Sequence, residues 1–471
     1  MYSNNSNNNS NNNSNNFDIF TYLLSLNVNV TVIDVSHKNL YCLPDLSRFG
    51  NLKKLVCSHN NLPYLPQLPI GLLYLDCSHN NLKSMPALNE NLDYLNCSFN
   101  PDLTNVPELN EQLKILKCSD CDFTYLPPLK NIEALCCCRN RLVCLPELPN
   151  TLTYLDCTNN QLQELPCHRF HKGFRKIYCS HNQLKRLPEF NEDLETIICA
   201  RNKLTRLPEL NDQLEFLECD NNELICLPNF NAKLQIIDCS YNKIEKLPAM
   251  NDELLHISCS HNKLQNLSAF PHKLDYINCE YNRLTQLPKL NPCLKTLMCS
   301  YNRLIVLPPL NNELIRLDCN HNRLTHLPAL NQNLNELNCI NNKIIVLPLL
   351  NESLNSILFS NNPAYTIIYG NAITFHHHRN YFYDLMNMDE YQEFMFENST
   401  SIHHLAKKVK TLHKFRFLFY SLKFKTGFRT FLWEKIRRPK IEAKYHPDNL
   451  HKLLKNISDE DDVSEIWTAD D

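Results

Sequence analysis

The sequence predicts an α/β-type repeat solenoid, and three observations predict it: a period of 20 residues, a fixed apolar pattern within each period, and a proline step that opposes helix. The template L-x-x-L-x-C-S-x-N-x-L-x-x-L-P-x-L-N recurs from about residue 28 to residue 362, for example at 72–88 and 234–250. Self-similarity at such a period is the signature of a repeat architecture. We therefore expect about 17 stacked coils.

Each period is expected to begin with a short strand. In L-x-x-L-x-C the second leucine and the cysteine are two residues apart, so they point to the same side of an extended chain. Stacked coils would pair these strands into one parallel sheet with that side buried. The step is 20 residues almost throughout, Val35 and Phe359 extend the column at its ends, and the cysteines are Cys57, Cys77, Cys97, Cys118, Cys137, Cys157, Cys179, Cys199, Cys219, Cys239, Cys259, Cys279, Cys299, Cys319 and Cys339.

The asparagine three residues after the cysteine is expected to turn the chain out of the strand. Its amide can donate to and accept from backbone groups that the turn leaves unpaired, so the amides would form a ladder along the stack. Cys121 replaces this asparagine in one coil, and Lys38 replaces it in the first. The Leu-Pro step then predicts an extended or polyproline-like return on the convex side, because proline fixes φ and disfavours helix.

The cysteine usage predicts packing rather than disulfides. The chain has 23 cysteines, an odd number, and its first sixteen residues are almost wholly Asn and Ser, unlike a secretory signal. In-register side chains on adjacent strands run parallel, whereas a disulfide needs crossed Cβ vectors. A thiol also behaves as a small hydrophobe that fits beside a neighbouring coil.

Two clusters have the residue types of metal ligands. Cys136–Cys138 adjoin a C-x-x-C pair made by Cys118 and Cys121, and His59 and His79 occupy equivalent positions in adjacent coils. A zinc site needs four converging ligands. The core and the turn already use the cysteines, and the histidines have no third ligand, so we predict no metal and no cofactor.

The template resembles the signature of the leucine-rich-repeat family. The short period with L-P-x-L-P, as at residues 65–69 and 145–149, is most similar to the twenty-residue class found in bacterial effector proteins. This resemblance implies a leucine-rich-repeat horseshoe, with the parallel sheet on its concave face, that acts as a protein-binding scaffold. Some effector relatives carry a C-terminal ubiquitin-ligase domain with a catalytic cysteine, but here no cysteine follows Cys339. The Asn- and Lys-rich composition is typical of an AT-rich genome, such as that of a large amoeba-infecting DNA virus.

The ends of the chain depart from the repeat. Residues 402–446 hold 13 Lys/Arg against 2 Glu, which would suit an anionic partner, although a helical cap with a solvated basic face is the simpler interpretation.

No apolar run reaches the ~18 residues of a membrane span, and we expect an intracellular, cytoplasmic location, in the host if the protein is viral. The predicted organisation is a disordered Asn/Ser-rich tail (1–16), an N-terminal cap (17–27), the solenoid (28–362), a helical basic and aromatic C-terminal cap or docking region (363–458) and an acidic tail (459–471).

The predicted binding surface is the concave face of the sheet. We expect its solvent-facing positions to lie three and one residues before the column cysteine, and one and two after it. Tyrosine and other aromatics are dense there and are favoured interface anchors, while ring stacking between coils is an alternative reason for them. The predicted partner-binding residues are Tyr74, Asp76, His79, Tyr94, Tyr154, Asp156, Tyr178, His181, Phe216, Glu218, Asp238, Tyr276, Tyr301 and His321.

The predicted function is a non-enzymatic scaffold for protein–protein interaction. The position before the cysteine leans acidic, so we expect a basic or polar protein partner and no nucleic acid on this face. A formal charge of −3 also argues against a polycation that coats nucleic acid or membrane. The alternatives are an adaptor that recruits substrates to a ubiquitin-ligase assembly through its C-terminal module, and a duplicated array that binds nothing specific. An enzyme ranks behind these, because no nucleophile–base pair or phosphate loop stands outside the repeat pattern.

Overall fold

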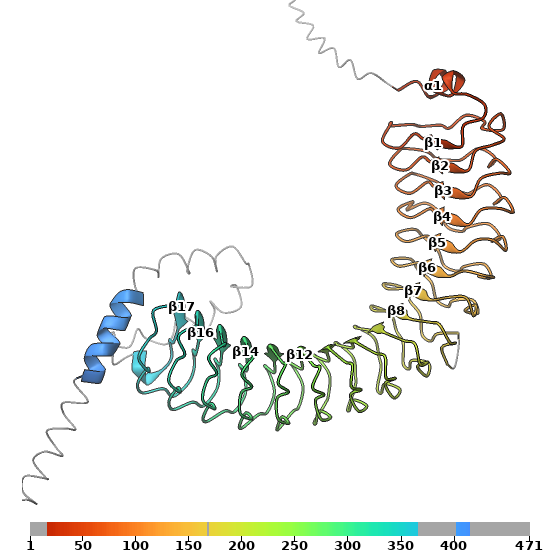
Figure 1. Cartoon of the computed structure of the whole chain (residues 1–471). Helices are drawn as coiled ribbons and strands as arrows, with labels where there is room; N and C mark the ends of the chain where they lie inside the picture. The colour runs from red at the N-terminus through yellow and green to blue at the C-terminus, as the bar shows by residue number, and fades with distance from the viewer. Residues whose placement is uncertain (1–16, 167–168, 366–401, 415–471) are drawn as a thin grey trace, which may run out of the picture. The chain divides into compact units, whose positions relative to one another are not determined.

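The computed structural model of the protein describes residues 17–166, 169–365 and 402–414. The first two ranges belong to one compact unit, the solenoid, and the third belongs to a second unit, which we describe by itself. Figure 1 shows the solenoid as a stack of coils, coloured from red at its N-terminal end to cyan at its C-terminal end.

Every coil contributes one strand of three residues to the solenoid. Their bounds are β1 (Val32–Asp34), β2 (Lys54–Val56), β3 (Tyr74–Asp76), β4 (Tyr94–Asn96), β5 (Ile115–Lys117), β6 (Ala134–Cys136), β7 (Tyr154–Asp156), β8 (Lys176–Tyr178), β9 (Thr196–Ile198), β10 (Phe216–Glu218), β11 (Ile236–Asp238), β12 (His256–Ser258), β13 (Tyr276–Asn278), β14 (Thr296–Met298), β15 (Arg316–Asp318), β16 (Glu336–Asn338) and β17 (Ser356–Leu358).

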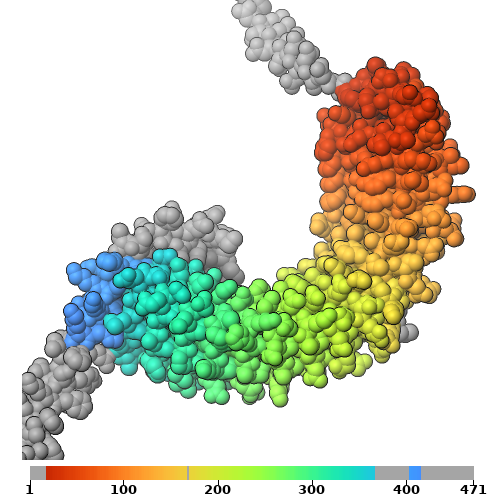
Figure 2. Space-filling view, in the orientation of Figure 1, coloured from red at the N-terminus to blue at the C-terminus, as the bar shows by residue number. Residues whose placement is uncertain are grey.

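The strands pair in chain order, each with the next, as one parallel 17-stranded sheet in register. Leu75 of β3, for example, lies opposite Leu95 of β4. Strands β12 to β17 lie on the inner side of the curved stack in Figure 1, and the space-filling view shows successive coils in contact along its length (Figure 2). The predicted solenoid with a parallel sheet on its concave face is confirmed.

The core is a set of apolar columns, one rung per coil. Leu72, Leu75, Cys77 and Leu82 of a single coil are all fully buried, as are their equivalents in most coils. Burial raises the pKa of the Cys77 thiol well above its usual range, and every cysteine in the described part of the chain is a free thiol. The predicted packing role of the cysteine column is therefore confirmed. The leucines contribute most of the core, because burying one leucine side chain fully stabilises the fold by about 1.5–3 kcal/mol.

The predicted asparagine ladder is also confirmed. The Asn80 amide nitrogen donates to the carbonyl oxygens of Cys57, Cys77 and Ser78 at 3.0, 3.1 and 3.2 Å. Its oxygen accepts from the backbone N–H of Leu62 at 2.9 Å. Because these partners belong both to its own coil and to the preceding one, each buried amide ties two turns together and satisfies backbone groups that would otherwise be unpaired.

The ladder is interrupted where Cys121 replaces asparagine. The Cys121 thiol donates to the carbonyl oxygens of Cys97 and Ser119 at 3.4 and 3.5 Å, so it keeps part of the donor role. It has no strong acceptor to offer the preceding coil. There the Leu103 N–H instead donates to the carbonyl of Asn100 within its own turn, at 3.0 Å.

A second asparagine ladder, which we did not predict, lies at the residue that ends the template. The Asn311 amide nitrogen donates to the carbonyl oxygens of Asn291 and Leu294, in the preceding coil, at 2.8 and 2.9 Å. Equivalent bonds are made by Asn191, Asn211, Asn231, Asn251, Asn291, Asn331 and Asn351.

The described residues outside the coils are partly helical, at Ile19–Ser25, 363–365 and 402–414. Helix α1 (Ile19–Ser25) precedes β1; the Asp18 carboxylate caps it by accepting from the Phe20 N–H at 3.0 Å, and Ile19 and Leu23 are buried. In the second unit, residues 402–414 form a helix. No helix in the described ranges is long and apolar enough to span a membrane. Most of the predicted 363–458 region and both predicted tails lie outside the described residues.

Candidate functional site

Three columns of side chains form the concave surface. The first and third residues of each strand face away from the buried second residue, and we call these the first and third strand columns. The residue two after the column cysteine follows the strand, and it has a positive φ in all 17 coils, for example 53° at His79 and 50° at Tyr281. We call it the left-handed column.

The left-handed column is conformationally costly for its residues. A non-glycine residue in this region loses roughly 1–2 kcal/mol to steric crowding, and Asn, Asp and His tolerate it best. This explains Asp120, Asn159, Asn221, Asn341 and Asn361 in the column. It does not explain the Phe and Tyr rings, Phe99, Tyr241, Tyr281 and Tyr301, so another interaction must favour them.

Ring stacking supplies that interaction in the first coils. His37, His59, His79 and Phe99 stack in series, with ring centroids 4.2, 4.1 and 4.0 Å apart and planes within 12° of parallel. We call these four residues the N-terminal ring ladder. Aromatic pairs at such distances contribute about 0.5–1.5 kcal/mol each beyond the area that they bury.

A longer series occupies the same column near the other end. Tyr241, His261, Tyr281, Tyr301 and His321 stack with centroids 3.9, 4.0, 4.0 and 4.0 Å apart, and we call them the C-terminal ring ladder. The imidazole of His321 also lies 2.7 Å from the Asn341 amide nitrogen, which extends the series by one coil. Ring stacking between coils, the alternative reason for the aromatics, is therefore present, while ring edges stay open to solvent: Tyr241 is 49% and Tyr281 41% exposed.

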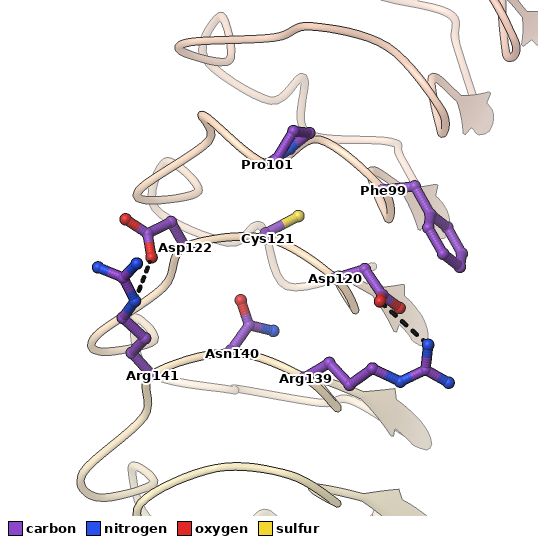
Figure 3. Close-up of a pocket in the computed structure, with 8 residues that line it drawn as sticks. All are labelled: Phe99, Pro101, Asp120, Cys121, Asp122, Arg139, Asn140 and Arg141. Carbon is purple, nitrogen blue, oxygen red and sulfur yellow. Dashed lines mark hydrogen bonds and ion pairs between the residues drawn. The ribbon is translucent and has the colours of Figure 1, made fainter.

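Between the two ladders the left-handed column is polar. An open pocket of about 510 Å³ lies beside its first polar residues, Asp120 and Arg139 (Figure 3). It lies at the interruption of the asparagine ladder, with ion pairs between Arg139 and Asp120 at 3.1 Å and between Arg141 and Asp122 at 2.8 Å. Burial raises the pKa of Cys121 to about 11, so this residue is a neutral thiol and a weak nucleophile near pH 7. The pocket is lined by Phe99, Pro101, Asp120, Cys121, Asp122, Arg139, Asn140 and Arg141.

The first strand column holds a tyrosine pair flanked by cations. The rings of Tyr74 and Tyr94 stack at 4.1 Å, the Lys54 ammonium lies 4.5 Å from the Tyr74 ring centre, and the Lys117 ammonium lies 5.7 Å from that of Tyr94. Burial raises the pKa of the Tyr74 hydroxyl to about 12. Stacking and cation–π attraction hold these rings in fixed orientations on the surface.

The third strand column holds carboxylates that are fixed by the residue after the cysteine. Asp76 accepts from the backbone N–H and the hydroxyl of Ser78 at 3.0 and 2.7 Å. Asp318 accepts from the hydroxyl of Ser300 at 2.7 Å and from the Asn338 amide at 3.0 Å. Burial raises the pKa of Asp238, so ionised carboxylates here are incompletely solvated.

One predicted column is wrong in part. We expected the residue after the cysteine to face solvent, but where it is serine it is mostly buried, as at Ser78 and Ser300. The alternation of the strand ends at the cysteine because the next residue but one turns into the left-handed conformation. The small hydroxyl therefore packs beneath its neighbours and serves the carboxylates.

The predicted partner-binding residues lie on this one surface, in separate groups along the sheet. Tyr74, Asp76, His79 and Tyr94 come together on β3 and β4 and the turn between them. A second group on β7 and β8 comprises Tyr154, Asp156, Tyr178 and His181, where the Tyr154 and Tyr178 ring centroids are 5.4 Å apart. Phe216, Glu218 and Asp238 adjoin on β10 and β11, Tyr276 lies on β13, and Tyr301 and His321 belong to the C-terminal ring ladder.

Two features of this surface were not predicted from the sequence. The left-handed conformation could have been inferred from the recurrence of Asn, Asp and His two residues after the cysteine. The second feature lies at the fourth residue after the column cysteine, which is basic in six consecutive coils: Lys243, Lys263, Arg283, Arg303, Arg323 and Lys343. In the described part of the chain, no group of three or more His, Cys, Asp or Glu is placed to hold a metal ion.

Comparison with solved structures identifies the fold. The leucine-rich effector protein YopM from Yersinia pestis is 30% identical, with a TM-score of 0.60 over 70% of this chain and 88% of that chain. YopM from Yersinia enterocolitica is 27% identical, with a TM-score of 0.58 over 71% and 88%. InlJ from Listeria monocytogenes, whose functional domain includes a cysteine ladder, shares the fold at 24% identity and a TM-score of 0.50 over 67% and 68%. No protein-family model and no curated protein matches the chain.

Proposed function

The chain belongs to the leucine-rich-repeat protein family, and from that premise we propose that it is a non-enzymatic scaffold that binds a protein partner on its concave sheet face. The observation that carries this proposal is the organisation of rings on that face. Tyr74 and Tyr94 are stacked and held by cations, and the two ring ladders present their edges to solvent. Rings that are packed against neighbouring rings and cations lose less conformational entropy on binding than free side chains do, which favours them as interface anchors.

The charge of the third strand column fits the same role. Glu218 and Asp238 adjoin on neighbouring strands, and burial raises the pKa of both carboxyls. A basic or polar group of a partner would stabilise the ionised carboxylates, whereas a nucleic acid would be repelled. We therefore propose a protein partner with basic or polar residues opposite β10 and β11.

The location and the alternative function are proposals that do not depend on the concave face. We place the protein inside a cell, because Cys42, Cys144 and Cys226 are exposed free thiols, which a reducing compartment preserves. The adaptor function depends on residues 363–458, and a viral origin depends on composition. Both stay predictions from the sequence.

Affinity capture from a eukaryotic cell lysate with three full-length baits tests the proposed function. The baits are the natural chain, a concave variant with Tyr74, Tyr94 and Tyr154 changed to alanine, and a control variant with Tyr41, Tyr64 and Tyr125 changed to alanine. The control tyrosines are 72%, 56% and 56% exposed and lie outside the strands.

We expect the natural chain and the control to capture the same protein, and the concave variant to retain less than about a tenth of it, a loss of about 1.4 kcal/mol or more. Circular dichroism would establish that all three baits are folded. A partner that the concave variant retains, or a natural chain that captures nothing, contradicts the proposal.

A further inference from the structure

We propose that the C-terminal half of the solenoid binds an extended acidic peptide segment, along a strip formed by six cations beside the C-terminal ring ladder. The strip comprises the fourth residue after the column cysteine in six coils, and we call it the basic strip: Lys243, Lys263, Arg283, Arg303, Arg323 and Lys343. This inference rests on the proposed function, because it names the chemistry of the partner at one place on the surface.

The backbone holds the rungs of the basic strip in register. The Arg283 N–H donates to the Leu264 carbonyl of the preceding coil at 2.9 Å, and the Arg303 N–H donates to the Leu284 carbonyl at 2.8 Å. Each cation is therefore one coil from the next, and adjacent strands are ~4.8 Å apart. Except for Lys263, which is half-buried, the six residues are exposed.

The strip has little internal neutralisation. Lys243 pairs with Glu223 at 2.9 Å, but the structure gives the side chains of the other five cations no acidic partner within the described residues. Like charges on neighbouring rungs repel one another. A bound row of carboxylates would relieve this repulsion and add charge-assisted hydrogen bonds, which Arg283, Arg303 and Arg323 can make with two nitrogens at once.

The adjoining ring ladder favours the same kind of ligand. The faces of His261, Tyr281 and Tyr301 are covered by neighbouring rings at 3.9–4.0 Å, so only their edges are available to a ligand. Ring edges carry positive partial charge and accept apolar contact. They offer no free face within the ladder on which a nucleobase could stack, and base stacking is a main source of affinity for single-stranded nucleic acid.

A wide anionic ligand is disfavoured by the acids in the same coils. Asp238, Glu280 and Asp318 lie on the other side of the ring ladder, before or directly after the column cysteine, and burial raises the pKa of Asp238 and Glu280. A nucleic-acid duplex that covered both columns would bring phosphates to these carboxylates. A narrow chain that follows the basic strip and the ring edges would not.

An extended peptide has a suitable length and a suitable alternation of side chains. Six coils span about 24 Å, which is the length of roughly seven extended residues at ~3.4 Å each. Alternate side chains of an extended peptide point to opposite sides. Acidic residues at every second position could therefore face the basic strip, with about three or four acids for six cations, while aromatic or apolar residues between them face the ring edges.

Fluorescence anisotropy with a labelled peptide of six Glu-Tyr repeats tests the inference on three full-length proteins. They are the natural chain, a strip variant (R283E/R303E/R323E) and a control variant (K83E/K185E/R206E) with the same change of net charge. The control residues Lys83, Lys185 and Arg206 are exposed and belong to coils that contribute no residue to the basic strip. We expect the natural chain to bind the peptide in a salt-dependent manner, the strip variant to bind at least tenfold more weakly, and the control to change by less than about twofold.

A gain of binding gives a second test that does not depend on loss. Asn61 and Asn81 occupy the fourth position beside the N-terminal ring ladder, so N61K/N81R should strengthen peptide binding by a few fold. The inference is overturned if the strip and control variants weaken equally, if the natural chain does not bind the peptide at low salt, or if a twelve-nucleotide single strand binds the strip more tightly than the peptide. Loss of peptide binding alone would leave the captured concave-face partner, and thus the proposed function, standing.

Discussion

The two ring ladders have the same backbone and nearly the same stacking distances, but they have different neighbours. The N-terminal ladder lies beside the amides of Asn61 and Asn81, and the nearby tyrosines carry lysines above their rings. The C-terminal ladder lies between a basic strip and a row of half-buried acids, as at Arg283 and Glu280. The comparison shows that the repeat supplies a uniform scaffold, and that a few free positions per coil decide what each stretch of it can bind.

The largest effect is expected from interrupting the asparagine ladder beneath the C-terminal rings. Asn282 donates to the carbonyls of Cys259, Cys279 and Glu280 at 3.0–3.2 Å and accepts from the Leu264 N–H at 2.9 Å. Asn282→Cys should lower the free energy of unfolding by about 2–4 kcal/mol, because buried backbone groups lose their partners.

The natural interruption supplies the matched comparison for this variant. At Cys121 the preceding turn already satisfies its own N–H, so Cys121→Asn should change the free energy of unfolding by less than about 1 kcal/mol. Urea unfolding followed by circular dichroism measures both variants. Equal effects at the two positions would show that the turn at Cys121 is not adapted to the loss of asparagine.

A smaller effect is expected from removing single residues of the left-handed column. Tyr281 stacks on two rings at 4.0 Å, whereas Arg201 has the same positive φ and no ring contact. Glycine relieves the backbone crowding at both positions. Tyr281→Gly should still destabilise by about 1 kcal/mol, because two stacked pairs are lost, and Arg201→Gly should be neutral or stabilising by up to ~1 kcal/mol. Thermal unfolding would measure this; a stabilising Tyr281→Gly would mean that stacking does not hold the rings.

The smallest effect is a dependence of stability on pH. Burial lowers the pKa of His261. The pKa of His59 is lowered mainly by burial and to a smaller extent by repulsion from His79 and His37, while the Asp76 carboxylate opposes that shift. A histidine pKa that is lower in the folded chain favours the neutral form, so the stability is complete above the ordinary pKa of about 6.5 and declines as the pH falls through it.

We therefore expect the Tm to fall slightly between pH 7.5 and pH 5.5, by about 1–2 °C per histidine at most. His59→Phe and His261→Phe should each flatten this dependence. Burial raises the pKa of Glu218, Asp238 and Glu280. Protonation of these carboxyls therefore stabilises the fold as the pH falls, and this opposite contribution acts at lower pH. A Tm that rises over the stated range would contradict the assignment to histidine.

The repeat itself made most of the fold predictable from the sequence. The spacing of Leu75, Cys77 and Asn80 gave the strand, its buried side and the amide ladder, because each residue type has one physical role that repeats in every coil. The burial of Ser78 was not predictable from strand alternation, since it depends on a backbone turn that alternation does not encode. The basic strip was readable in the sequence, but its significance required knowing that its rungs adjoin a stacked ring ladder.

The cysteine column has a consequence for measuring how the solenoid opens. Almost every coil carries one thiol that is fully buried and, because burial raises its pKa, is protonated at neutral pH. Such a thiol reacts with an alkylating reagent only when its own coil, or the one beside it, separates. The column therefore works as a series of internal reporters, spaced one turn apart, that a pulse of alkylation followed by mass spectrometry can read. Each coil between the first and the last therefore records its own opening without any introduced label.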